Sequence, residues 1–118
     1  MNLKLCESDY KFISIIWENE PIRSGKLVEL CASRLNWKKS TTYTTLKKVC
    51  DKGLAQNENT IVTSLVKKEE VQEFESKHIV EESFSGSLPS FLTSFFAGKK
   101  ISDKEANELK KLIDDFKE

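Results

Sequence analysis

The feature that most constrains the fold is a change of hydrophobic period near the middle of the chain. In residues 8–20, 23–36 and 40–52, apolar side chains recur three or four positions apart, which is the spacing of an amphipathic helix. Residues 54–66 then place β-branched side chains after a polar NEN segment, which favours two short strands around a tight turn. Three helices followed by a hairpin is the element order of a winged helix. We therefore expect a mainly α fold with a small β-hairpin wing.

Capping residues indicate where the helices begin and end. Ser8 is expected to cap the first helix, and Gly53 is expected to end the third. Further along, Ser87 suits a helix start, and Ser102 with Glu105 forms a capping box. Two domains follow from this pattern. They are a winged helix-turn-helix domain at residues 1–66 and a C-terminal domain of three helices at residues 67–118.

The C-terminal segment carries more apolar side chains than three short helices hide by themselves. Such surface is usually covered by a second copy of the chain. Packing of these helices back onto the first domain is the alternative. The residues expected in a dimer interface are the aromatic and aliphatic side chains of the helical faces: Phe74, Leu88, Phe91, Leu92, Phe95, Phe96, Leu109, Leu112, Ile113 and Phe116.

The charge distribution points to the third helix as a binding surface. The whole chain has a formal net charge of zero, with 19 basic and 19 acidic residues. Residues 34–52 carry six lysines and arginines against Asp51 alone, a local charge of +5. Lysines neutralise phosphates, and hydroxyl groups bond to phosphate oxygens or base edges. The candidate DNA-binding residues on this helix are Lys38, Lys39, Ser40, Thr41, Tyr43, Thr44, Lys47 and Lys48.

Other function classes find little support in the residues. We see no nucleophile motif, no glycine-rich phosphate loop and no metal-protease motif, so we predict no catalytic residues and no cofactor. Three separated cysteines and a single histidine, His78, do not form the closely spaced ligand pairs of a zinc site, and we predict no metal site. Cys31 and Cys50 are expected to be small buried hydrophobic residues. No segment has the length of a membrane span or the core of a signal peptide, which predicts a cytoplasmic protein.

Three motifs in order resemble the penicillinase repressor family (BlaI/MecI/CopY) of winged-helix transcriptional repressors. The first helix ends in tryptophan as SDYKFISIIWE, and the third reads W-x-x-x-T-x-x-T-x-L-x-K, from Trp37 to Lys48, before DKGL. The tail sequences GSLPSFLTSFF and ISDKEANELKKLI resemble the dimerisation segment of that family. The resemblance extends from about Leu5 to Phe116. It implies a homodimeric repressor that binds a palindromic DNA operator upstream of a β-lactam resistance or related stress gene. In this role Thr41 and Thr44 read bases and the lysines hold phosphates.

The resemblance also implies how repression would be relieved. Relatives of the β-lactam branch are cut in the dimerisation tail through a membrane sensor-protease, which makes such a protease a candidate partner. The matching cleavage region here is Ser94 and Phe95. Copper release is not expected, because no cysteine follows Cys50. The chain departs from the family at the wing, whose tip QNENT has no lysine or arginine, and at Lys48, where the family usually has arginine. A winged-helix adaptor that binds a protein partner, without specific DNA binding, is the alternative function.

Overall fold

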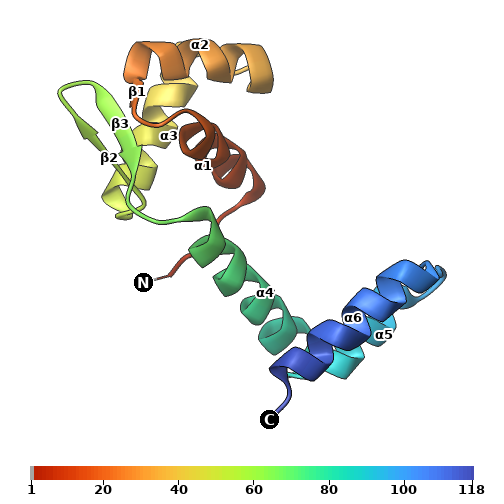
Figure 1. The fold of residues 1–118 in the computed structure, drawn as a ribbon. Helices are drawn as coiled ribbons and strands as arrows, with labels where there is room; N and C mark the ends of the chain where they lie inside the picture. The colour runs from red at the N-terminus through yellow and green to blue at the C-terminus, as the bar shows by residue number, and fades with distance from the viewer. Residues whose placement is uncertain (1) are drawn as a thin grey trace. The chain divides into compact units, whose positions relative to one another are not determined.

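The structure is a computed structural model that describes residues 2–118, and these residues form six helices and a three-stranded sheet (Figure 1). In chain order the elements are α1 (Glu7–Asn19), β1 (Ile22–Arg23), α2 (Ser24–Leu35), α3 (Lys39–Asp51), β2 (Ala55–Glu58), β3 (Ile61–Ser64), α4 (Lys68–Phe84), α5 (Leu88–Phe96) and α6 (Asp103–Phe116). The expected mainly α fold with a hairpin wing and a helical C-terminal part is confirmed. The chain divides into two compact units, of which the first ends at His78 and the second runs from Ile79 to Glu118.

The core of the first unit is built from the apolar faces of its helices and one face of its sheet. Its buried members come from every element of the unit: Phe12, Ile13, Ile15 and Ile16 of α1, Ile22 of β1, Leu27 and Cys31 of α2, Leu46 and Val49 of α3, Leu54, Ala55 of β2, Val62 of β3, Val66 and Val71 of α4. Full burial of one large aliphatic side chain is worth about 1.5–3 kcal/mol. The Phe12 ring also stacks on Trp37, with ring centroids 5.7 Å apart. These contacts hold α3 against α1 and α2, so the opposite face of α3 is left for solvent.

The wing is a hairpin with a two-residue turn. β2 and β3 pair antiparallel, with Glu58 opposite Ile61, and Asn59 and Thr60 lie between them with φ of 50° and 69°. Positive φ at both central residues is the signature of a type I′ turn, which matches the twist of the strands. The expected hairpin is therefore present, but the expected tip at NEN was wrong in position, because Asn57 and Glu58 belong to β2.

Sequence analysis missed one strand. β1 is only two residues long, and it pairs with β3, with Ile22 opposite Val62, which completes a sheet of order β1-β3-β2. A two-residue strand is too short to show alternation, so no pattern predicts it. Its pairing fixes the wing to the helices, and the Ser24 N–H also donates to the Thr60 carbonyl at 2.8 Å.

The predicted caps are correct at three helix ends and wrong at one. Ser87 and Ser102 each accept a hydrogen bond at 3.1 Å, from the amides of Ser90 and Glu105. Gly53 follows the end of α3 with φ of 79°. Ser8 does not cap α1: the helix already begins at Glu7, with Cys6 in the capping position and without a side-chain cap.

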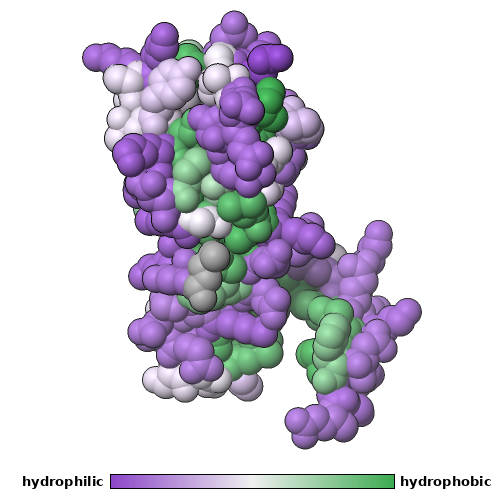
Figure 2. All heavy atoms as spheres, turned by 90° about the vertical axis from the view of Figure 1, so that its left-hand side faces the viewer, coloured by the Kyte–Doolittle hydropathy of each residue, from purple (hydrophilic) through white to green (hydrophobic). Residues whose placement is uncertain are grey.

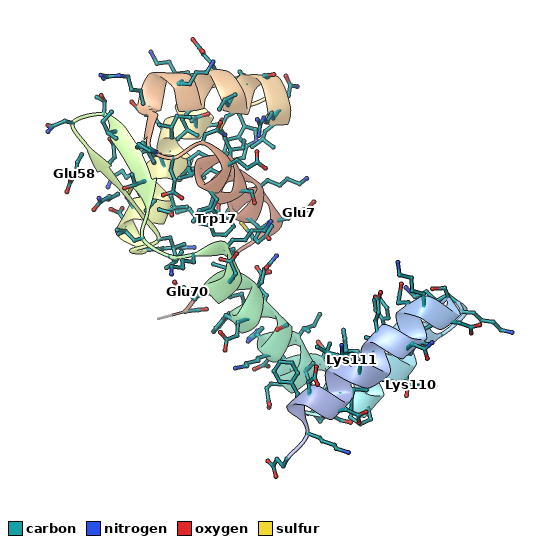
Figure 3. The ribbon with its side chains drawn as sticks, viewed as in Figure 1. Glu7, Trp17, Glu58, Glu70, Lys110 and Lys111 are labelled. Atoms are coloured by element: carbon teal, nitrogen blue, oxygen red, sulfur yellow. The ribbon has the colours of Figure 1, made fainter. Side chains whose placement is uncertain are left out.

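Two side chains, one in α1 and one directly after it, form hydrogen bonds with the segment that connects β3 to α4. The Trp17 indole Nε1 donates to the Val66 carbonyl at 2.9 Å (Figure 3). The Glu20 carboxylate accepts from both the amide and the hydroxyl of Ser64, at 2.8 to 2.9 Å. Val71, in the first turn of α4, is fully buried in the core of the first unit. The boundary that we expected after residue 66 lies just before α4, whereas the division between the compact units lies within α4.

The second unit leaves its apolar side chains open. No side chain of α5 or α6 is buried in the single chain. Aromatic contacts link the end of α4 to α5, with the Phe84 and Phe91 centroids 5.4 Å apart. The large hydrophobic residues that remain exposed in this unit are Ile79, Leu88, Phe95, Leu112, Ile113 and Phe116. Figure 2 shows hydrophobic residues in green open to solvent between hydrophilic residues in purple.

Candidate nucleic-acid interface

The predicted DNA-binding residues lie together on and next to α3. Lys38 occupies the capping position before the helix, and the other seven residues lie within α3. Thr42, Leu46 and Val49 form the buried stripe of the helix, so the predicted residues lie on its solvent side. All eight are exposed, including the aromatic Tyr43, which has 38% of its surface accessible. The structure therefore brings the predicted residues onto one surface, which we call the α3 face.

The structure separates the four threonines of α3 into two pairs. The Thr42 and Thr45 hydroxyls donate back to the carbonyls of Lys38 and Thr41, at 3.5 and 2.9 Å, as helical threonines often do. Thr41 and Thr44 are exposed, and their hydroxyls have no hydrogen-bond partner within residues 2–118. Of the four threonines of α3, Thr41 and Thr44 are therefore the two whose hydroxyl groups are free to donate to a ligand.

The first turn of α3 is open to an anion. No side chain caps the helix, so the amides of its first turn keep their hydrogen-bonding capacity. The positive end of the helix dipole lies at the same place. Lys38 and Lys39 flank it, and in the described part of the chain neither is paired with a carboxylate. Free amides and two unpaired ammonium groups are suitable ligands for a phosphate.

The lysines of the last turns of α3 are in a different electrostatic setting. Lys47 pairs with Asp51 on the same helix at 3.1 Å, with both side chains mostly exposed. Lys48 Nζ lies 2.9 Å from Oδ2 of Asp9 in α1, and Lys52 Nζ lies 3.7 Å from the same oxygen. The positive charge of each of these three lysines is therefore partly balanced by a neighbouring carboxylate.

Asp9 is the functional candidate that sequence analysis missed. It is 2% exposed, although aspartate is rarely buried unless it is paired. A signal was available, because Asp9 precedes Phe12 and Ile13 by three and four positions and so lies on the buried stripe of α1. The lysines that balance the charge of Asp9 are Lys48 and Lys52, which lie far from it in the sequence, so the sequence alone does not reveal the pairing.

The contact between Asp9 and Lys48 has the distance of a hydrogen bond. Oδ2 is shielded from solvent and has no hydrogen-bond partner among the described residues, so we describe the contact as an ion pair. The hydrogen-bonding distance to Asp9, together with the charge of that carboxylate, raises the pKa of Lys48 above its ordinary value. Lys48 therefore stays charged at all physiological pH values.

The wing offers no cation to a nucleic acid. β2, β3 and their turn contain neither lysine nor arginine, and Glu58 is exposed on the outer side of the hairpin (Figure 3). Asn57 and Asn59 are exposed polar residues on the same hairpin. The described wing can therefore donate hydrogen bonds from amide side chains, but it supplies no positive charge.

The three cysteines differ in burial. Cys31 is buried, as predicted, and Cys50 is partly buried, while Cys6 is exposed. Burial raises the pKa of the Cys31 thiol, and burial and the Asp51 charge raise that of Cys50.

Within residues 2–118 no cluster of metal-ligating side chains occurs. No helix among these residues is long and apolar enough to cross a membrane.

Comparison with known proteins gives a match over most of the chain. The sequence profile of a family described as "Penicillinase repressor" matches residues 5–115. A protein named "Penicillinase repressor" from Bacillus licheniformis is 19% identical over 118 residues. That alignment covers 97% of this chain and 92% of the relative. The match includes α3 and both helices of the second unit.

Proposed function

Because this chain belongs to the penicillinase repressor family, we propose that it is a transcriptional repressor that binds DNA through the α3 face as a homodimer. The observation that carries the proposal is the composition of that face. It combines unbonded hydroxyls on Thr41 and Thr44, an uncapped helix start, and a row of lysines. Winged-helix proteins place this helix in the DNA major groove, where hydroxyls reach base edges and ammonium groups reach phosphates.

The α3 face supplies two kinds of contact in this proposal. Thr41 and Thr44, with Ser40 and Tyr43 beside them, read base edges in the major groove. Lys38 and Lys39 hold phosphates at the start of the helix, and Lys47 and Lys48 hold phosphates further along. The wing contributes less affinity than the helix, because it carries no positive charge and exposes Glu58.

Dimerisation is supported by the surface that the second unit leaves open. α6 exposes Leu112, Ile113 and Phe116 to 51%, 58% and 81%, and a single chain gains nothing from that exposure. A second copy that covers these side chains would bury them and would place two α3 helices on one DNA molecule. A symmetric dimer then requires a palindromic operator, with half-sites one helical turn apart or a multiple of it.

Relief of repression by cleavage is a further part of the proposal. Ser94 and Phe95 lie in α5, exposed to solvent, upstream of the whole of α6. A cut between them would separate the exposed apolar face of α6 from the DNA-binding unit and weaken the dimer. The test is an immunoblot of cells before and after exposure to a β-lactam. A shortened chain supports this step, and an intact chain during derepression contradicts it.

The principal experiment is selection of bound duplexes from a random DNA pool by the purified protein at moderate salt. We expect a palindrome with a fixed half-site spacing. The rival function is an adaptor that binds a protein through the same face, and it is favoured by a wing without lysine or arginine and by the ion pairs of Lys47 and Lys48. DNA binding weakens steeply as salt rises, whereas an adaptor would leave the pool random at every salt concentration.

A further inference from the structure

A buried carboxylate next to the last turns of α3 is not explained by DNA binding alone. Asp9 carries a negative charge directly behind a helix whose charge must be positive to attract DNA. Its Oδ2 atom is shielded from solvent and faces Lys48 at 2.9 Å and Lys52 at 3.7 Å. An apolar side chain would pack at this position without the desolvation free energy that a buried carboxylate requires. The position of Asp9 therefore suggests a role for its charge.

The two lysines that Asp9 holds remain accessible on their other side. The side chains of Lys48 and Lys52 are 48% and 45% exposed, whereas the side chain of Asp9 is 3% exposed. An ammonium group has three donors, so one contact with Asp9 leaves the others available to a ligand in solvent. Both lysines thus have one side fixed by the protein and the other side open.

Fixing a lysine before it binds DNA changes the entropy of binding. A free lysine side chain has many rotamers, and a phosphate contact restricts them. A residue that orders the side chain beforehand removes part of this cost from the binding step. Asp9 is itself held in the first turn of α1, which is packed against α3 by the core.

We propose that Asp9 is a positioning residue for DNA binding, whose buried carboxylate holds the ammonium groups of Lys48 and Lys52 in place for contact with backbone phosphates. This inference rests on the proposed DNA-binding function. It assigns a role to a residue that does not itself touch DNA. It also gives Lys52 a role in phosphate binding together with Lys48.

Replacement of Asp9 by asparagine distinguishes positioning from simple charge. Asp9→Asn keeps the shape of the side chain and removes one negative charge near the DNA. If Asp9 acted only through its charge, the variant would bind DNA more tightly, because more net positive charge increases counterion release. If Asp9 positions the lysines, the variant binds more weakly although its local charge is more positive. The two explanations predict changes of opposite sign.

The experiment measures affinity for the selected operator by fluorescence anisotropy over a series of salt concentrations. We expect Asp9→Asn to bind about tenfold more weakly, as when two long side chains must be ordered during binding. The matched control is Asp51→Asn, which removes an exposed carboxylate from α3 itself and makes the same charge change. This control should bind as tightly as the wild-type protein or more tightly. Circular dichroism at the binding temperature verifies that each variant is folded.

A second comparison separates positioning from a general role in folding. In a protein that carries Lys48→Ala and Lys52→Ala, further replacement of Asp9 by asparagine should leave operator affinity unchanged or raise it, because only the effect of the removed negative charge remains. A further loss in that background would show that Asp9 acts through the fold, and it would overturn the proposal. If the wild-type protein binds the operator and Asp9→Asn binds it equally well or more tightly, the positioning role is overturned but the proposed DNA-binding function is not. Failure of the wild-type protein to bind any DNA overturns both this role and the proposed function.

Discussion

The ammonium of Lys48 lies 2.9 Å from the buried Oδ2 of Asp9, so a lysine of the α3 face also stabilises the packing of α3 on α1. Because the contact raises the pKa of Lys48, the stability that it contributes is fully present below about pH 10.4, the ordinary lysine value. That stability is lost as the pH rises through the higher pKa of the folded state.

The first prediction concerns this alkaline dependence. Lys48→Gln should lower the free energy of unfolding by a constant amount between pH 7 and about pH 10, and the difference from wild type should shrink at higher pH. Urea unfolding at a series of pH values measures it. Lys39→Gln is the control, since Lys39 is exposed on the same helix and has no acidic partner within residues 2–118. A difference that does not change up to the highest pH at which the protein folds would contradict the ion pair.

The second prediction concerns the two pairs of threonines. Thr44→Ala should weaken operator binding by about 1–3 kcal/mol and relax discrimination at one base pair, because its unbonded hydroxyl reads a base edge. Thr45→Ala makes the same chemical change on the same helix. Its hydroxyl is already bonded to the Thr41 carbonyl, so its affinity should stay close to wild type. Fluorescence anisotropy on matched and mismatched operators measures both affinities. Equal losses of affinity in the two variants would contradict the different roles of Thr44 and Thr45.

The third prediction concerns the wing turn. Thr60 is β-branched and adopts a φ of 69°, a conformation that favours glycine. Thr60→Gly should therefore raise the free energy of unfolding, by about 1 kcal/mol after the entropy cost of glycine is included. Chemical denaturation measures the change. The control is Thr63→Gly in β3, where the backbone is extended, and this variant should be less stable than wild type. If Thr60→Gly is not more stable than wild type, the turn assignment is contradicted.

The fourth prediction concerns thiol reactivity in the folded protein. Iodoacetamide at pH 8 should modify Cys6 first, then Cys50, and Cys31 only after unfolding. Cys31 is fully buried and its pKa is raised by burial, and reaction requires an accessible thiolate. Mass spectrometry of peptides taken over time gives the order. In denaturant the three rates should become similar, and early modification of Cys31 without denaturant would contradict the packing of α2.

The fifth prediction concerns the apolar face of α6. Leu112→Asp should shift the protein from dimer to monomer and abolish tight operator binding, because a charge on this face cannot be covered by a partner. Lys111→Asp introduces the same side chain at the neighbouring position, on the polar side of the helix, and should remain dimeric (Figure 3). Sedimentation velocity distinguishes the two states. Monomeric wild-type protein at micromolar concentration would contradict the dimer itself.

Local patterns in the sequence were sufficient to predict the helices, the hairpin and the family. Hydrophobic period, β-branched residues and caps act between neighbours in the chain, so they predicted the helices, the hairpin, and the ends at Ser87, Ser102 and Gly53. The stripe Thr42, Leu46 and Val49 likewise determined which face of α3 is exposed.

The contacts between segments that are distant in the sequence could not be predicted and became visible only in the folded chain. The pairing of β1 with β3 depends on where α1 and the wing pack, and a strand of two residues has no pattern of its own. The ion pair of Asp9 with Lys48 and Lys52 depends on the approach of α1 to α3, which no local pattern specifies. Charges interact through space and not along the chain. The lysines of a basic segment look alike in the sequence, and only the fold shows which of them lie next to a buried carboxylate.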